Sequence, residues 1–166
     1  IDYFKLPLSM EKALYKSPLG WIEICTSTNG VTHIHFIDAP SNPPKKTSPF
    51  LDLVVQQLDN YFIQQSKTFS FPLDPSGTDF QLEVWRMLHQ IPHGTTLPYL
   101  KIAQKFGDIK KVRAIASAIA KNPILIAIPC HRVIGSDRSL VGYSGGLERK
   151  RKLLELEGFP KQNSLF

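Results

Sequence analysis

A cysteine followed directly by a histidine is the pair of residues in this chain best suited to covalent chemistry. Cys130 and His131 come after an apolar run at 124–128. Such a run predicts a buried β-strand, which would hold the thiol rigidly at its end. A thiolate is a strong nucleophile, and an imidazole can act as its base. The opposing interpretation is structural, because a buried cysteine is more often inert.

The position of His131 decides how it could assist Cys130. Neighbouring side chains of an extended chain point to opposite sides, so direct contact would require a turn at 129–130. A bridging water is the easier route. The histidine would in turn need an orienting acceptor, as in other nucleophile and base pairs.

Length and composition limit the class of protein. The 166 residues are 42% hydrophobic and suffice for one domain or two small ones. The chain shows neither a membrane-spanning run nor a secretory signal pattern. Its two cysteines, Cys25 and Cys130, could form one disulfide, but free thiols are favoured. We therefore expect a cytoplasmic protein, or a nuclear one if the source is eukaryotic.

Positive charge is concentrated in the half of the chain that contains Cys130. Residues 1–77 carry 6 Lys/Arg and 7 Asp/Glu, whereas residues 78–166 carry 14 and 7. The net charges are −1 and +7, which agree with the total of +6. A polyanionic partner such as nucleic acid is therefore plausible, although a basic surface can also serve solubility alone.

Turn and periodicity signals predict the elements of each half. In the first half, strands at 21–26 and 31–36 flank an Asn-Gly turn, and a helix begins at Ser48-Pro49. A break at 72–77 suggests a domain boundary. In the second half, helices are expected near 80–91, 99–106, 110–121 and 147–157. The pair joined at Gly107 is a helix-turn-helix signal, and residues 135–146 form a glycine-rich loop.

A series of short motifs in the second half matches a known family in order and spacing. The motifs are GTDFQ (77–81), VW (84–85), IP (91–92), GTT (94–96), Tyr99, IA (102–103), RA (113–114), NP (122–123), IPCHRV (128–133), GYSGGL (142–147), Lys150, LL (153–154) and EG (157–158). Together they resemble the O6-alkylguanine-DNA alkyltransferase family. The match covers about half of the chain, and the first half agrees only in general plan.

The resemblance implies an α/β fold in two domains. Residues 1–76 would form a small antiparallel sheet plus helix of the ribonuclease H-like kind, and residues 77–166 a mainly helical winged helix-turn-helix domain. It also implies irreversible, stoichiometric transfer of the alkyl group from O6-alkylguanine, and from O4-alkylthymine, to Cys130. The base would be flipped out of double-stranded DNA through the minor groove. No cofactor is implied, and the expected state is a monomer, with cooperativity on DNA left open.

The resemblance also assigns roles to individual residues. The catalytic set would be Cys130 as acceptor, His131 as base, Glu157 as its orienting group and Tyr99 as donor to the leaving guanine. The substrate set would be Ser144 near O6, the Val133 carbonyl near the exocyclic amine, Tyr143 in the loop, and Asn122 as a hinge. The DNA set would be Arg113 in the gap left by the flipped base, Ala114 on a closely approaching helix, and Lys110, Lys111 and Lys121 at phosphates.

Several alternatives remain open from the residues alone. Cys130, His131 and Glu157 could form the triad of a cysteine hydrolase, or Cys130 could be structural in a simple DNA binder. By spacing alone, Glu157 reads as a surface carboxylate. Arg138 replaces a common glycine and has no assigned role. A metal site is not expected, because a two-residue turn at Asn29-Gly30 would pair Cys25 with Ile34 and point it away from His33 and His35.

Overall fold

The computed structural model describes residues 6–43 and 47–159, and the chain divides into two compact units. The first unit runs to Thr78 and also includes Pro123–Ala127. The second comprises Asp79–Asn122 and the chain from Ile128 onward. The expected α/β architecture is confirmed, with a small antiparallel sheet and helix followed by a mainly helical part.

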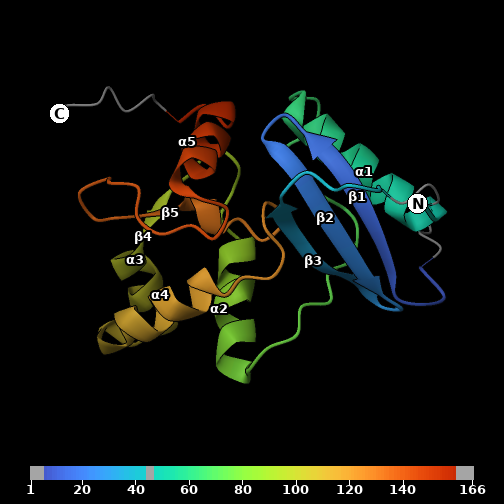
Figure 1. The fold of residues 1–166 in the computed structure, drawn as a ribbon. Helices are drawn as coiled ribbons and strands as arrows, with labels where there is room; N and C mark the ends of the chain where they lie inside the picture. The colour runs from blue at the N-terminus through green and yellow to red at the C-terminus, as the bar shows by residue number, and fades with distance from the viewer. Residues whose placement is uncertain (1–5, 44–46, 160–166) are drawn as a thin grey trace. The chain divides into compact units, whose positions relative to one another are not determined.

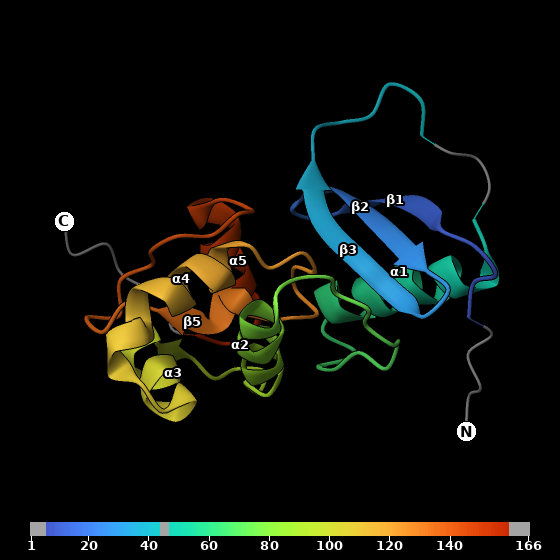
Figure 2. The same ribbon diagram turned by 90° about the horizontal axis from the view of Figure 1, so that it is seen from below.

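The first unit is a three-stranded antiparallel sheet with one helix on its face. Its strands are β1 (Glu11–Ser17), β2 (Gly20–Ser27) and β3 (Gly30–Ile37), in the order β1-β2-β3. Helix α1 (Pro49–Phe62) runs along one side of the sheet (Figure 2). The Ser48 side chain accepts from the Leu51 N–H, which confirms the predicted start of this helix. Sequence signals located β2 and β3, whereas β1 was missed.

The register between β2 and β3 differs from the prediction. Cys25 lies opposite His33, not Ile34, because the turn falls one residue earlier and a bulge follows Cys25. Glu23 lies opposite His35. These four side chains therefore share a face of the sheet, and the reason given above for excluding a metal was wrong. Among the described residues, however, no three His, Cys, Asp or Glu side chains are placed to hold a metal ion.

Within its described residues, the second unit contains four α-helices and a two-stranded parallel ladder (Figure 1). Helix α2 (Asp79–His89) is followed by β4 (Leu97–Pro98), α3 (Tyr99–Phe106), the 3₁₀ turn η1 (Ile109–Lys111) and α4 (Val112–Ala120). A second 3₁₀ turn, η2 (Cys130–Arg132), leads into β5 (Val133–Ile134) beside β4, and α5 (Leu147–Leu156) comes last. Gly107, at φ 99°, ends α3 as predicted.

The apolar run before Cys130 is buried but is not a strand. Its backbone pairs with β3 around Ile34, whose N–H donates to Pro123 O and whose carbonyl accepts from the Leu125 N–H. The chain then turns at Ile126, whose φ is 71°. The predicted strand was wrong because burial alone produces the same apolar pattern in a turn as in a strand.

No helix among the described residues is long and apolar enough to cross a membrane.

Candidate active site

Cys130 is held in a tight turn at the start of η2. Its N–H donates to Ile128 O at 2.8 Å, and the Arg132 N–H donates to Pro129 O at 3.0 Å. The side chain is 4% exposed. Direct contact between the Cys130 and His131 side chains would require a turn at 129–130, and that turn is present. Cys130 is fixed by backbone hydrogen bonds and not by a strand.

The Cys130 side chain lines an apolar pocket of about 310 Å³ within the second unit. The pocket walls come from α3, α4 and the loop between β5 and α5. They are formed by Tyr99, Ala116, Ile119, Ala120, Cys130, Val141, Gly142, Tyr143 and Ser144. Three expected site residues, Tyr99, Tyr143 and Ser144, thus surround the same pocket as the thiol.

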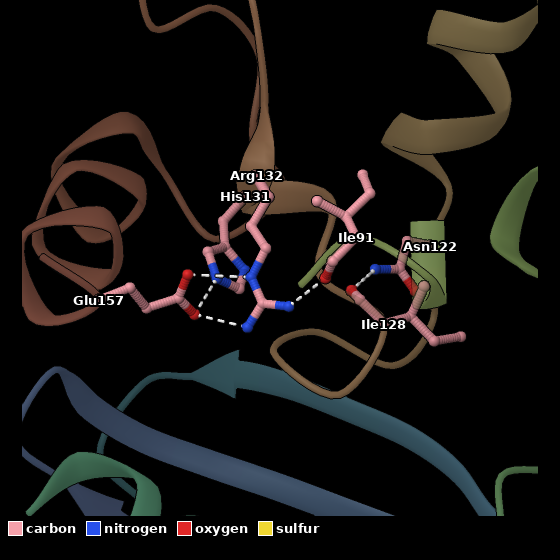
Figure 3. A network of polar contacts seen from close by, with 6 residues as sticks. All are labelled: Ile91, Asn122, Ile128, His131, Arg132 and Glu157. Atoms are coloured by element: carbon pink, nitrogen blue, oxygen red, sulfur yellow. Dashed lines mark hydrogen bonds and ion pairs between the residues drawn. The ribbon is translucent and has the colours of Figure 1, made fainter. Parts of the chain in front are cut away.

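Glu157 binds the two side chains that follow Cys130 in η2 (Figure 3). Its Oε1 lies 2.8 Å from His131 Nε2 and 2.8 Å from Arg132 Nη2, and its Oε2 accepts from Arg132 Nε at 2.9 Å. Arg132 also donates to Ile91 O at 2.6 Å. The side chains of His131 and Glu157 are at most 1% exposed. Glu157 is therefore a buried partner of His131, not a surface carboxylate.

This arrangement determines which form of His131 is present. Burial lowers the pKa of His131, although Glu157 opposes the shift, so the ring is neutral near pH 7. Burial would by itself raise the pKa of Glu157, but hydrogen bonds from His131 and Arg132 hold it well below its usual range. A carboxylate can only accept, so the neutral ring carries its proton on Nε2. Nδ1 is then a buried acceptor with no hydrogen-bond partner among the described residues.

The thiol itself is difficult to ionise without help. Burial raises the pKa of Cys130 to about 11, whereas the Asn122 side chain and the positive charge of Lys150 oppose the shift. Asn122 also donates through Nδ2 to Ile128 O at 2.7 Å (Figure 3). The resting cysteine is therefore a thiol at neutral pH, and an attack by sulfur requires a base such as His131 Nδ1.

Lys150 is a fully buried cation that joins β5 to the loop before α5. Its Nζ donates to Val133 O at 2.6 Å, Val141 O at 3.0 Å and Gly142 O at 3.2 Å. The Tyr99 hydroxyl donates to the same Val141 O at 3.1 Å. Burial raises the pKa of Tyr99, so its phenol remains protonated and able to donate. One expected acceptor, the Val133 carbonyl, is thus already bound by Lys150.

The residues expected to contact DNA lie on one segment of the second unit. Lys110, Lys111, Arg113, Ala114 and Lys121 are all exposed, on η1, on α4 or directly after α4. Ile115, Ala118 and Ile119 point inward, and Trp85 Nε1 donates to Ala118 O at 2.9 Å. Helix α4 is therefore fixed on its inner face, and Arg113 on its outer face lies between exposed lysines that flank the helix.

Two residues of this site received no role from the sequence. Arg132 and Lys150 stand within the quoted motifs, yet nothing in their local sequence indicates burial. Arg132 fixes the Glu157 carboxylate, and Lys150 fixes the loop.

The fold and the site together define a class of protein, one that presents a buried cysteine, followed by a buried histidine, to a pocket beside a helix-turn-helix. Comparison with models of known protein families identifies this class. The DNA-binding domain of 6-O-methylguanine DNA methyltransferases matches residues 79–159, and their ribonuclease-like domain matches residues 10–75. The chain belongs to the 6-O-methylguanine DNA methyltransferase family.

Individual relatives agree along most of the chain. The methylated-DNA–protein-cysteine methyltransferase of Methanosarcina acetivorans is 39% identical over 155 residues, which cover 90% of this chain and 99% of the relative. That of Haemophilus influenzae is 40% identical, with coverages of 88% and 85%. The crystal structure of the Mycobacterium tuberculosis O6-methylguanine methyltransferase aligns with a TM-score of 0.80 at 35% identity, covering 93% and 96%. A Mycobacterium tuberculosis relative crystallised with DNA gives 0.80 at 37% identity, covering 89% and 92%.

Proposed function

We propose that this protein repairs DNA by moving the alkyl group of O6-alkylguanine to Sγ of Cys130, once per protein molecule. The observation that carries the proposal is the buried Cys130 thiol at the pocket wall, followed by a neutral His131 whose Nε2 is tied to Glu157. This arrangement leaves Nδ1 of the imidazole as the basic atom. The same chemistry extends to O4-alkylthymine, whose alkyl group is also bound to an exocyclic oxygen.

The transfer is a displacement at an sp³ carbon. His131 Nδ1 takes the thiol proton, through a bridging water, as Sγ forms a bond to the alkyl carbon. The bond between that carbon and O6 breaks, and its electron pair stays on the guanine. The Tyr99 phenol donates a hydrogen bond to the departing base, which offsets the charge that develops on it. The thioether product does not hydrolyse, so the protein is consumed.

The pocket supplies the contacts that select guanine. Ser144 lies at the pocket wall and would hydrogen-bond O6, and Tyr143 would pack against the base. Val133 O would accept from the exocyclic amine with the lone pair that Lys150 does not use. Asn122, bonded to Ile128 O, would hold the backbone that joins α4 to the cysteine turn.

The O6 position is reached only when the nucleotide leaves the base stack. Helix α4 would approach the minor groove, which carries little sequence information and so suits a repair protein. The exposed Arg113 would fill the gap left by the flipped base, and the small Ala114 would permit close approach. The exposed lysines Lys110, Lys111 and Lys121 would contact phosphates. We expect the protein to act as a monomer.

Intact-protein mass spectrometry tests the proposal directly. Protein mixed with excess O6-methylguanine duplex should gain one methyl group and then stop, with the modified residue mapped to Cys130. Cys130→Ser should bind the duplex and gain nothing, because a serine hydroxyl is scarcely ionised at neutral pH. Repeated turnover would instead support a hydrolase, and methylation of Cys25 or of neither cysteine would refute the assignment.

A further inference from the structure

Two donors from different helices meet at a single carbonyl in the pocket wall. Val141 O accepts from the Tyr99 hydroxyl of α3 at 3.1 Å and from Lys150 Nζ of α5 at 3.0 Å. Val141 belongs to the loop that also carries Tyr143 and Ser144, and all of these loop residues line the pocket. The free protein therefore uses the Tyr99 phenol to hold the loop.

The proposed function requires the same phenol for another purpose. A phenol has one proton and cannot donate fully to Val141 O and to a departing guanine at once. Base binding must then withdraw Tyr99 from the loop. When Tyr99 leaves, Lys150 remains bonded to Val141 O.

We propose that Val141 O is a shared acceptor through which base binding is coupled to the loop: the bound base takes the Tyr99 hydroxyl, and Lys150 alone then keeps the loop in place. Lys150 is suited to this task because it is fully buried and also bonds to Val133 O and Gly142 O. It is a positioning residue, since it holds the pocket wall and does not touch the reacting atoms. The coupling rests on the proposed function, because it needs Tyr99 to donate to the base.

Hydrogen exchange of the loop in the free protein tests the shared acceptor without any chemistry. Tyr99→Phe should change the exchange of backbone amides at 139–144 by less than about twofold in the wild type, since Lys150 still holds Val141 O. In Lys150→Met it should accelerate exchange by roughly threefold to tenfold, the usual effect of losing one hydrogen bond. Equal effects of Tyr99→Phe in the two backgrounds would overturn the proposal.

Matched variants keep this test interpretable. Lys152→Met, on the same helix and half-exposed beside Glu148, should leave the effect of Tyr99→Phe as in the wild type. If Lys150→Met fails to fold, Lys150→Gln replaces it. The glutamine has two amide N–H donors but a shorter side chain. In its background Tyr99→Phe should accelerate exchange at 139–144 by more than in the wild type and by less than in Lys150→Met. An effect of Tyr99→Phe equal to that in the wild type would overturn the proposal.

The pH profile of methyl transfer separates this role from a purely structural one. Burial lowers the pKa of Lys150 to about 8, against the opposing charge of Cys130. Above that pH the neutral amine keeps two N–H donors for three carbonyls. The titratable groups that act on or lie near Lys150 are Cys130 and His131 of η2 and Tyr99 of α3. Tyr99 has a raised pKa and stays protonated in this range.

Growing ionisation of Cys130 raises the transfer rate of both proteins with pH, so the ratio of the wild-type rate to the Lys150→Met rate should fall above about pH 8. A ratio that does not change with pH would refute the role of Lys150. If the wild type transfers no methyl group, the proposed function fails, while hydrogen exchange still decides whether the acceptor is shared.

Discussion

Glu157 accepts hydrogen bonds from both side chains that follow Cys130. These bonds determine the ionisation of Glu157 and the tautomer of His131. The two oxygens of Glu157 bind one nitrogen of His131 and two of Arg132. The carboxylate therefore stays ionised although it is buried, and the imidazole is held in the tautomer whose Nδ1 can accept a proton. A single residue thus links the orientation of the His131 ring to the neutralisation of a buried arginine.

Replacing this carboxylate should damage both stability and transfer. Glu157→Gln leaves Arg132 without its anion, so we expect unfolding in urea to show a loss of about 3 to 5 kcal/mol, typical of a broken buried ion pair. The methyl-transfer rate should fall as well, because the amide no longer fixes the His131 tautomer. Glu148→Gln in α5 is the control: its side chain is 63% exposed, so the loss of stability should be much smaller. Equal losses in the two variants would contradict this account.

Among the elements, α4 is anchored from within and free on its outer face. The Trp85 indole of α2 donates to Ala118 O, and Ile115 and Ile119 are buried. Arg113 is exposed on the other side, among alanines that add little bulk. The element is therefore suited to approach a nucleic-acid groove without changing the core of the unit.

Removing the Arg113 side chain should separate base flipping from chemistry. We expect Arg113→Ala to slow repair of methylated duplex by tenfold or more, since extruding a base costs a few kcal/mol. Its reaction with free O6-benzylguanine, which needs no extrusion, should change by less than about twofold. Single-turnover rates on the two substrates provide the comparison, with Lys101→Ala on the exposed side of α3 as control. Equal losses on both substrates would show that Arg113 acts on the chemistry or on folding.

At the scale of the whole molecule, two buried groups make stability depend on pH in the same direction. The pKa of His131 is lowered by burial from 6.5, so below that pH the unfolded chain binds a proton that the folded chain resists. The pKa of Glu157 is lowered despite burial, through His131 and Arg132, so its contribution is lost only at more acidic pH. Both effects make the protein less stable as the solution becomes acidic.

Urea unfolding between pH 7.5 and pH 5 should show this loss. Below the ordinary pKa of histidine we expect stability to fall by up to about 1.4 kcal/mol for each pH unit over which His131 stays neutral. His131→Gln should flatten that part of the curve, whereas His33→Gln, at an exposed position on β3, should not. A wild-type stability independent of pH in this range would show that His131 is not held neutral by burial.

Local signals in the sequence determined much of the fold and many of the site residues. Asn29-Gly30, Ser48-Pro49 and Gly107 act on the backbone within a few residues, so they located the hairpin, the start of α1 and the end of α3. The spaced motifs predicted the family and the residues around the pocket. The exact position of the turn was predicted wrongly, and the turn one residue earlier together with the bulge after Cys25 places Cys25 opposite His33.

Only the tertiary structure decided what depends on contacts between distant parts of the chain. The residues at 124–128 are equally apolar as a strand or as a buried turn, and contact with Ile34 together with the turn at Ile126 selected the latter. Lys150 lies in α5 and Glu157 directly follows this helix, and the sequence neighbourhood of both residues predicts exposure. They are buried because Arg132 neutralises one and three loop and strand carbonyls bind the other, and those partners are brought together only by folding.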